Sequence, residues 1–494
     1  MARINTNIPS LIAQNNLSRT NGDMQVRLQR LSTGLRINRG ADDPAGLIVS
    51  ERLRSEMQGI NQAIDNSERA SSVIATSEGY LAEVADLLNS IKSLVVEASS
   101  TGGVSREEVE ANQLEIDSAI ESITRISNTA SFAGLQLLNG NLDYTTSGVV
   151  AADVAGVQIK GAQFGSKSNI DVEVSINQPA ETAGLFLSGA AGGFTNGALN
   201  SAVTLEIAGN LGVQSLSFVS GTTLSAMQDA INLVSESTGV EANLANPADH
   251  TSGLVLSSAE FGSESFISVK PLSGGTTFTS YAAEDDATTV QRDEGVDVSA
   301  VVNGALAVGN GLEVALNTPA LSFELDLTEA FATSAPATSS NFVVTGGGAQ
   351  FQLGPSISAT QSVGVGIQSV AATRIGGTSV GGDRFFLDSI KSGSTNSLLS
   401  GNFSSASDVL DNAITEISVL RGRLGAFERN TLQTNVNSLQ VGLENITASE
   451  SKIRDTDFAT ETAQLTRAQI LTQAGTSVLA TANSSAQNVL ALLQ

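Results

Sequence analysis

The sequence predicts an α+β multidomain protein, in which both chain termini contribute to a long coiled-coil-like α-helical bundle and a β-rich outer region is inserted between them. Three observations lead to this prediction. The eight prolines leave residues 45–178 and 356–494 free of proline, which costs about 3 kcal/mol inside a helix. Apolar residues in these flanks recur at steps of three and four. Between about 141 and 394, short alternating runs rich in Thr, Ser, Val and Gly are typical of strands.

The 494 residues are enough for roughly three or four compact units. We expect five segments along the chain. They are an N-terminal helix at 1–40, the first part of a helical rod at 41–140, a β-rich region at 141–394, the second part of the rod at 395–455, and a C-terminal helix at 456–494.

The rod segments are predicted from heptad-like apolar rows, which are typical of helices that pack as coiled coils. Steps of four and three residues recur on both sides of the β-rich region and are interrupted by breaks between helices. The residues expected to pack in the rod are Leu53, Met57, Ile60, Ile64, Leu88, Ile91, Val95, Ile116, Ile120, Ile123, Ile417, Leu420, Leu424, Phe427, Leu439, Leu443 and Ile446.

One break between helices is marked by the stretch INRGADDPAGL. Gly40 follows one predicted helix, and Asp43 and Pro44 read as the N-cap and first residue of the next. The alternative is that Asp42 and Asp43 are metal ligands or an acid/base pair. Since no third acid, His or Cys lies nearby in the sequence, helix capping is the preferred interpretation.

In the β-rich region, the runs AVTLEIAG, QSLSFVSG and LSFELDL predict strands separated by Gly and Asn turns. A single amphipathic helix, TLSAMQDAINLVSESTG, is expected among them, with Thr223 as its N-cap. The region holds 7 basic and 24 acidic residues, a net charge of −17 out of −25 for the whole chain. This concentration of acidity predicts an outward-facing, solvated module.

The amino-acid composition argues against most kinds of catalytic and metal site. There is no Cys, no Trp and a single His, so Cys/His zinc sites and most nucleophile–base constellations are excluded. His250 is expected to be a solvated loop residue, and the glycines of TGGGAQFQLG lack the Lys-Ser/Thr of a phosphate-binding loop. We therefore predict no enzyme activity, no catalytic or metal residues and no cofactor. An excess of 50 acidic over 25 basic residues also disfavours nucleic acid and anionic membranes as partners.

Both chain ends carry unusually long uncharged stretches. No charged residue lies between Ile4 and Ser18, or after Arg467 to Gln494. An unpaired charge is costly in a packed interior, so paired neutral ends suit a packed environment built from many copies. The residues expected to pack there are Ile4, Ile8, Leu11, Leu17, Leu471, Val478, Leu479, Ala482, Val489, Leu490 and Leu493.

Neither a cleavable signal peptide nor a membrane span is predicted. The start MARINTNIPSLIAQNNL has no continuous apolar segment, and the chain has no run of eighteen or more apolar residues. We expect a soluble chain without membrane insertion which, if exported, uses an uncleaved route.

Several long motifs resemble bacterial flagellin, the subunit of the flagellar filament. They are INTNIPSLIAQNNL, RLSTGLRINRGADDPAGLIVSERL, NTASFAGLQLLNG, LRGRLGAFERNTL and the C-terminal IRDTDFATETAQLTRAQILTQAGTSVLATANSSAQNVLALLQ. The resemblance covers about residues 1–140 and 400–494. In the middle, TLSAMQDAINLVSESTGVEA is similar to a helix motif that recurs in flagellin and hook-protein inserts.

The resemblance implies that 1–40 and 456–494 are filament-core helices lining a central channel, and that the rod forms an inner domain. It also implies a self-polymerising, extracellular filament protein used for swimming motility. The implied partners are other copies of the chain, the flagellar type III export apparatus, an export chaperone, and the cap and hook-associated proteins.

The sequence departs from the family pattern at two places. Ala486 stands where a proline commonly precedes QNVL, so the last helix is expected to run unbroken. The segment LNSIKSLVVEAS has Ser90 and Lys92 at two positions usually held by Arg, and Ser93 at a position usually held by Glu. These differences argue against recognition by the vertebrate flagellin receptor.

Two alternative functions are compatible with the same terminal motifs, and a third is considered separately. A hook–filament junction protein of the flagellum also has such terminal helices, but the length of QILTQAGTSVLATAN favours a filament subunit. A flagellin-type scaffold that displays an adhesin or enzyme would need a functional insert, and no catalytic residues are found in it. A membrane-active translocator is disfavoured by the scarcity of basic residues.

Overall fold

The computed structural model describes residues 6–491 apart from 101, 166, 189–193, 250–251, 274–278, 283–288, 319 and 381–382, and it describes no side chains at 379–380, 383 and 485–491. His250 lies outside the described residues. Contacts divide the chain into two units. Unit 1 comprises Met1–Ile74, Phe351–Ser362 and Leu424–Gln494, and unit 2 comprises Ala75–Gln350 and Val363–Arg423.

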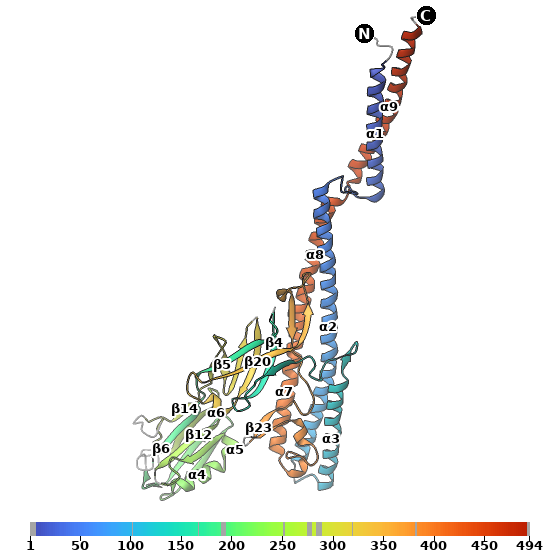
Figure 1. Ribbon diagram of the computed structural model, residues 1–494. Coiled ribbons are helices and arrows are strands. Elements are labelled where there is room, and N and C mark those ends of the chain that lie inside the picture. The colour runs from blue at the N-terminus through green and yellow to red at the C-terminus, as the bar shows by residue number, and fades with distance from the viewer. Residues whose placement is uncertain are drawn as a thin grey trace. The chain divides into compact units, whose positions relative to one another are not determined.

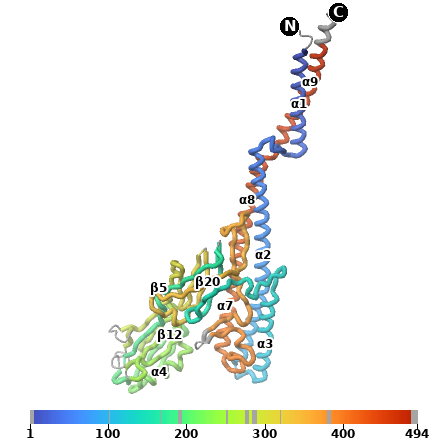
Figure 2. Tube along the Cα trace, viewed as in Figure 1, coloured from blue at the N-terminus to red at the C-terminus, as the bar shows by residue number. Residues whose placement is uncertain are grey.

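Unit 1 contains two antiparallel helix pairs formed by segments from opposite ends of the chain. Helix α1 (Ile8–Thr33) lies beside α9 (Phe458–Ala491), with both termini at the same end of the pair (Figures 1 and 2). The first part of α2 (Pro44–Ala98) pairs with α8 (Thr434–Arg454). A hydrogen bond from Asn435 to Ser67 and one from Arg454 to Glu51 fix the second pair.

Helix α2 carries a buried row that alternates steps of three and four residues. From Ile60 onward, its members are Ile60, Ala63, Ser67, Ala70, Ile74, Ser77, Leu81, Val84, Leu88, Ile91, Val95 and Ala98. A row that repeats every 3.5 residues keeps one narrow stripe of the helix against its partners, as in coiled coils. Gly59 belongs to the same region and lies against the loop of Pro355, where an added Cβ would be 3.0 Å from Pro355 Cβ.

A π-helical segment shifts the register of the C-terminal rod helix. Helix α7 (Phe403–Phe427) continues through η4 (Glu428–Gln433) directly into α8. The sequence rows end at Phe427 and restart at Val436, with buried Leu432 between them. Leu432 lies one residue beyond the position that an uninterrupted heptad row would give after Phe427, and a π turn absorbs one extra residue without ending the helix. The predicted break is therefore a change of phase within one continuous helix.

Helix α3 (Arg106–Thr129) completes the helical part of unit 2. It begins with a capping box in which Ser105 and Glu108 bond each other's backbone N–H groups. Its buried Gln113 donates to the carbonyl of Ile390 (2.9 Å) and accepts from the N–H of Leu398 (2.8 Å). These bonds hold η2 (Leu387–Ile390) and η3 (Leu398–Ser400) against the helix.

The β-rich part of unit 2 contains two cores. The first lies between two antiparallel sheets and includes Val174, Leu325 and Phe323. One sheet has the order β16 (Ala305–Leu306), β15 (Ser299–Val302), β5 (Ile170–Gln178), β20 (Ser339–Gly347), β3 (Tyr144–Ser147). The other has the order β17 (Val308–Asn310), β18 (Glu313–Asn317), β19 (Leu321–Leu327), β4 (Val154–Ala162), and α6 (Glu329–Ala332) follows β19.

The second core belongs to a module inserted into the first. Its sheets have the orders β10 (Val213–Phe218), β9 (Val203–Ala208), β13 (Phe266–Ser273), β14 (Arg292–Glu294), and β11 (Val240–Leu244), β12 (Gly253–Phe261), β6 (Thr182–Ser188). The entry and exit of the module are paired, because Glu181 and Val296 exchange two backbone hydrogen bonds of 3.0 and 2.9 Å.

Short elements complete the described chain. They are the hairpins β1 (Ser131–Phe132) with β2 (Leu135–Gln136), β7 (Phe194–Thr195) with β8 (Ala198–Leu199), β21 (Ala349–Gln352) with β22 (Ser362–Val365), and β23 (Thr378–Val380) with β24 (Asp383–Phe385), and the turn η1 (Ala359–Gln361).

The expectation of one helix at TLSAMQDAINLVSESTG is wrong, since the structure has two, α4 (Leu224–Asn232) and α5 (Ser235–Thr238). Thr223 caps the first, accepting from the N–H of Ala226 at 3.3 Å. The helix ends where the Asn232 amide both donates to and accepts from the backbone of Ala242, at 2.9 and 2.7 Å. An Asn side chain that bonds a strand backbone in this way ties the helix end to β11 and favours termination there.

Candidate assembly surface on the terminal helices

The contact between α1 and α9 follows a heptad row on each helix. On α9, the residues shielded from solvent are Glu461, Leu465, Ala468, Thr472, Gly475, Leu479 and Ala482, at alternating steps of four and three. On α1, they include Ser10, Ala13, Leu17, Met24, Arg27 and Leu31. Many of these residues are small or polar, so the two helices approach closely but bury little apolar surface.

Specific contacts fix how the two helices are aligned. The Asn7 amide donates to the carbonyl of Ala482 (3.0 Å), and the Ser10 hydroxyl bonds the Asn483 side chain (2.8 Å). Further along, Gly475 leaves room for Leu17, since an added Cβ would lie 3.3 Å from Leu17 Cδ1.

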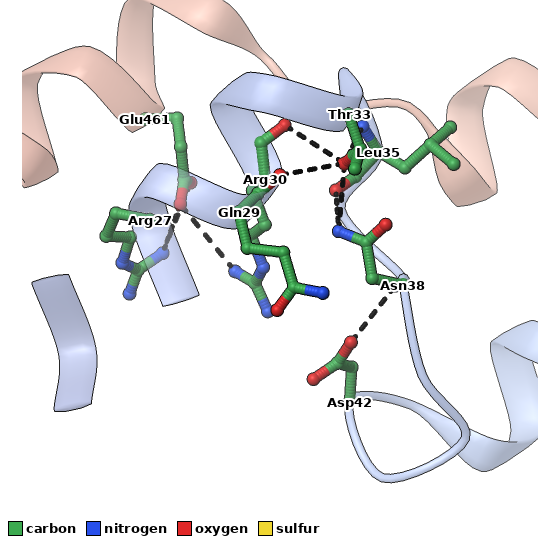
Figure 3. Close-up of polar contacts among 8 residues, drawn as sticks. All are labelled: Arg27, Gln29, Arg30, Thr33, Leu35, Asn38, Asp42 and Glu461. Carbon is green, nitrogen blue, oxygen red and sulfur yellow. Dashed lines mark hydrogen bonds and ion pairs between the residues drawn. The ribbon is translucent and has the colours of Figure 1, made fainter. Parts of the chain in front are cut away.

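A buried carboxylate closes the other end of the pair (Figure 3). Glu461 is only 6% exposed, and its two oxygens accept from Arg27 Nη1 at 3.1 and 3.2 Å. Arg30 Nη1 lies 4.0 Å from the same carboxylate. The two arginines compensate the negative charge of Glu461. Removing the carboxylate, or removing both arginines, would leave a charge in this contact without a partner. Glu461 is not predictable as a contact residue from the apolar rows; the only signal in the sequence is that it lies shortly before the uncharged C-terminal stretch.

The connection from α1 to α2 is held by backbone bonds to the end of α8. The N–H of Arg36 donates to Arg454 (2.6 Å), and the N–H of Thr456 donates to Gly34 (2.9 Å). Gly34 has a φ of 73°, a left-handed conformation that glycine adopts without strain. Ile37, the residue after Arg36, is almost completely buried.

The carboxylates at the start of α2 bond the backbone. Asp42 Oδ2 accepts from the N–H groups of Asn38 (3.0 Å) and Arg39 (2.8 Å), and these bonds lower the pKa of Asp42, the Arg39 bond contributing most (Figure 3 shows the Asn38 bond). Asp43 Oδ1 accepts from the N–H of Gly46 at 2.9 Å, and α2 begins at Pro44. Within the described residues, no group of three or more His, Cys, Asp or Glu could hold a metal ion.

The apolar residues of α1 and α9 mostly point away from the contact between the helices. The exposed large apolar side chains are Ile8 (51%), Leu11, Ile12, Val26 and Leu28 on α1, and Phe458, Ile470 (62%), Leu471 and Val478 on α9. Among the described side chains of both helices, the buried apolar residues are only Ala13 and Ala468. Several large apolar side chains of the pair therefore remain exposed, whereas a helix pair that is stable alone covers most of its large apolar residues.

The predicted packing residues at the chain ends fall into three groups. Leu17, Leu479 and Ala482 are half-buried at the α1–α9 contact, whereas Ile8, Leu11, Leu471 and Val478 are exposed. Ile4 and Leu493 lie outside the described residues, as do the side chains of Val489 and Leu490.

Leu471 and Val478 do not share the contact that Ala482 makes with α1 within the chain. The row that faces α1 passes through Thr472 and Leu479, one position further along. A displacement of one residue rotates a side chain by about 100° around the helix, so Leu471 and Val478 belong to the uncovered side.

The predicted rod residues are shielded to different degrees. Those that are buried are Ile60, Leu88, Ile91, Val95, Ile116, Ile120, Ile123, Ile417, Leu420 and Leu424. Those that are half-buried are Leu53, Met57, Ile64, Phe427, Leu439, Leu443 and Ile446. The α8 residues are half-buried because the α2–α8 pair leaves each helix with one covered side.

Within the described residues, none of the helices is long and apolar enough to cross a membrane.

Comparison with known proteins identifies the two helical flanks. Residues 4–143 match the bacterial flagellin N-terminal helical region, and residues 407–493 match the bacterial flagellin C-terminal helical region. The chain is 27% identical to a flagellin of Salmonella rubislaw and 29% identical to the B-type flagellin of Pseudomonas aeruginosa, each over 99% of both chains. The chain belongs to the bacterial flagellin family. The resemblance inferred from the sequence motifs is thus confirmed.

This family membership defines the general role of the molecule. As a flagellin, it is a structural subunit of the bacterial flagellar filament, which is extracellular. Residues 204–260 match the flagellin hook IN motif and lie in the inserted second module. Among solved structures, FliC from Burkholderia pseudomallei covers 74% of this chain at 16% identity, with a TM-score of 0.26.

Proposed function

We propose that α1 and α9 form the contact through which copies of this flagellin polymerise, and that the segments 1–40 and 456–494 are its filament-core helices. The observation that carries the proposal is the exposed apolar side of the α1–α9 pair, which includes Ile12, Ile470 and Val478. Packing against other copies would remove this surface from water, at about 25 cal/mol for each Å² of apolar area.

The polar contacts within the helix pair support the same assignment. The alignment of α1 with α9 is fixed by hydrogen bonds and the Glu461 ion pairs, which specify geometry but add little net stability. Each chain can thus present a defined but incompletely stabilised helix pair. Assembly then supplies the missing apolar burial.

The remaining parts of the proposal concern the five segments and the partners. Segments 41–140 and 395–455 would form the inner rod domain, and 141–394 the variable outer region. The chain would leave the cell through the flagellar type III export apparatus with its N-terminus uncleaved, after an export chaperone has covered the C-terminal helix. Polymerisation would take place between hook-associated proteins and a cap protein. The exposed apolar side of α9 supports a need for cover before export.

The variant Val478→Asp tests the assembly surface. Val478 is 58% exposed in the single chain, so the variant monomer should fold and stay soluble. In the polymer, the carboxylate would be buried without a partner, at a cost of several kcal/mol per subunit. We expect no elongation of wild-type filament seeds at neutral pH, measured by light scattering.

Asn246→Asp provides a matched control, because it adds the same charge at an exposed residue of the inserted module. This variant should elongate seeds normally. Normal elongation by Val478→Asp would contradict the proposal.

A further inference from the structure

The inserted module has one sheet whose two edges are constructed differently. At one edge, β14 is three residues long, and all three, Arg292, Asp293 and Glu294, are charged. At the other edge, β10 is six residues long, has the sequence VQSLSF and carries no charge. Short length and charged side chains are devices by which proteins keep edge strands from pairing with other chains. The β14 edge has both devices, and its Asp293 also accepts from the N–H of Gly184 in β6 (2.7 Å), whereas the β10 edge is longer and uncharged.

The β10 edge is also regular and apolar. Its pairing with β9 runs from Val213 opposite Ala208 to Phe218 opposite Val203 without a register shift, so no bulge twists it away. Val213 is 58% exposed, and Leu211 and Val219, directly before and after the strand, are 63% and 72% exposed. We call the segment from Leu211 to Val219 the neutral edge.

Two further observations concern the surroundings of the neutral edge. Residues 207–228 contain no charged residue, in a region (141–394) whose net charge is −17. Leu233, 87% exposed, lies between α4 and α5, and the backbone N–H of Leu211 donates to Thr238 at the end of α5 (3.4 Å). The neutral edge is therefore a place where two copies of an acidic region can approach without strong repulsion.

We propose that the neutral edge binds a second copy of this chain, with β10 pairing antiparallel against β10 of the other copy. The inference rests on the proposed filament only in that polymerisation brings the inserted modules of many copies close together. Pairing would join two four-stranded sheets through backbone hydrogen bonds and cover Val213 and Val219.

The contact is expected to depend on assembly. Six residues of strand pairing bury far less than the roughly 1,200 Å² of a specific, stable interface, so dissolved monomers should pair weakly. Copies held side by side in a polymer have an effective concentration near the millimolar range, which favours a weak contact. Because antiparallel β10 strands are related by a local two-fold axis, the contact joins modules in pairs and is distinct from the helical contacts of the terminal helices.

Single cysteines test the proposal, since the chain has no cysteine of its own. Ser215 lies near the middle of β10 and is exposed, so Ser215→Cys places two thiols close together when two β10 strands pair. Asn243→Cys, at an exposed position of β11 in the same module, is the matched control. Filaments of each variant are oxidised mildly and analysed on non-reducing gels.

We expect about tenfold more disulfide-linked dimer from Ser215→Cys filaments than from Asn243→Cys filaments, and little from either monomer. Adding Val213→Lys should abolish the Ser215→Cys dimer and leave polymerisation intact, whereas adding Ala248→Lys should change neither. Equal cross-linking at both cysteines, or an absence of dimers in well-formed Ser215→Cys filaments, would overturn the inference. A failure of wild-type chains to polymerise would instead count against the proposed function.

Discussion

The double variant Leu471→Ala/Val478→Ala separates the stability of the monomer from the stability of the filament. Both residues lie on the uncovered side of α9, where they are 49% and 58% exposed. Burying a whole Leu or Val side chain contributes about 1.5–3 kcal/mol, so covering the exposed half in a polymer contributes about 1 kcal/mol for each. Truncation to Ala should therefore weaken subunit addition by about 2 kcal/mol, which raises the critical concentration about 30-fold.

The assay is the concentration of monomer that remains in the supernatant after seeded polymerisation and sedimentation. Thermal unfolding of the monomer, followed by circular dichroism, should be almost unchanged, because exposed side chains contribute little within the single chain. The matched control is Leu306→Ala/Val308→Ala. It removes the same atoms from residues that are 68% and 74% exposed in the β-rich region, and should leave the critical concentration as in the wild type. An unchanged critical concentration for the α9 variant would refute the reasoning.

Three further predictions concern stability and order. Burial raises the pKa of Glu416 to about 7, from 4.5, despite a backbone bond from Gly376 and the nearby Arg384. Between about pH 4.5 and 7, the folded state thus holds a proton that the unfolded state releases. The stability that this proton contributes to the folded state is fully present below pH 4.5 and is lost as the pH rises through 7. Glu416→Gln should remove that dependence and raise the free energy of unfolding at pH 8 by up to about 3 kcal/mol, measured by urea titration; a wild-type pH dependence in the variant would contradict it. Replacing 182–295 by a Gly/Ser linker should still give filaments by electron microscopy, because Glu181 and Val296 are already paired at the entry of the module; a folded but non-polymerising deletion would show that the module belongs to the lattice. Finally, circular dichroism should show more helix in filaments than in monomers, since α1 (26 residues) and α9 (34 residues) bury few residues in the single chain; equal helix content would argue against this.

The sequence was sufficient to predict the helical flanks, because heptad rows report directly on which residues a helix buries. Ile116, Ile120 and Ile123 are all fully buried in α3, as their spacing predicts. The phase change near Leu432 was visible only as a gap between two rows. A π turn and a true end of the helix interrupt the apolar row in the same way, so only the three-dimensional structure distinguishes them.

The terminal helices show a limit of pattern reading. An uncharged helix with apolar residues on several sides does not reveal which side meets its own chain and which meets other copies. Here Leu465 and Leu479 face α1 together with the small Ala468 and Gly475, while Leu471 and Val478, which are equally apolar, remain exposed. Apolar character alone does not separate the two groups, because large exposed apolar residues are typical of surfaces that contact other molecules.

The boundaries of the inserted module could not be predicted from the sequence either. The composition of 141–394 is acidic and rich in strand-like runs throughout, so it offers no reason against removing residues of about 190 to 350 together. That cut would leave β4 without β19 and β5 without β20, and so open the first core. Strand partners far apart in sequence have no local signature, because pairing depends on the tertiary fold.

Removal of Ala468–Gln494 tests the central claim, that the terminal helix pair is the assembly element, most directly. The deleted stretch would form about 40 Å of helix and includes Gly475, which faces Leu17, and the uncovered Val478. The rod keeps its own buried rows in α2, α3 and α7, so the shortened chain should remain soluble and largely folded. Growth of wild-type filament seeds in its presence is followed by light scattering. We predict no elongation by the truncated chain, and elongation at the wild-type rate would contradict the account.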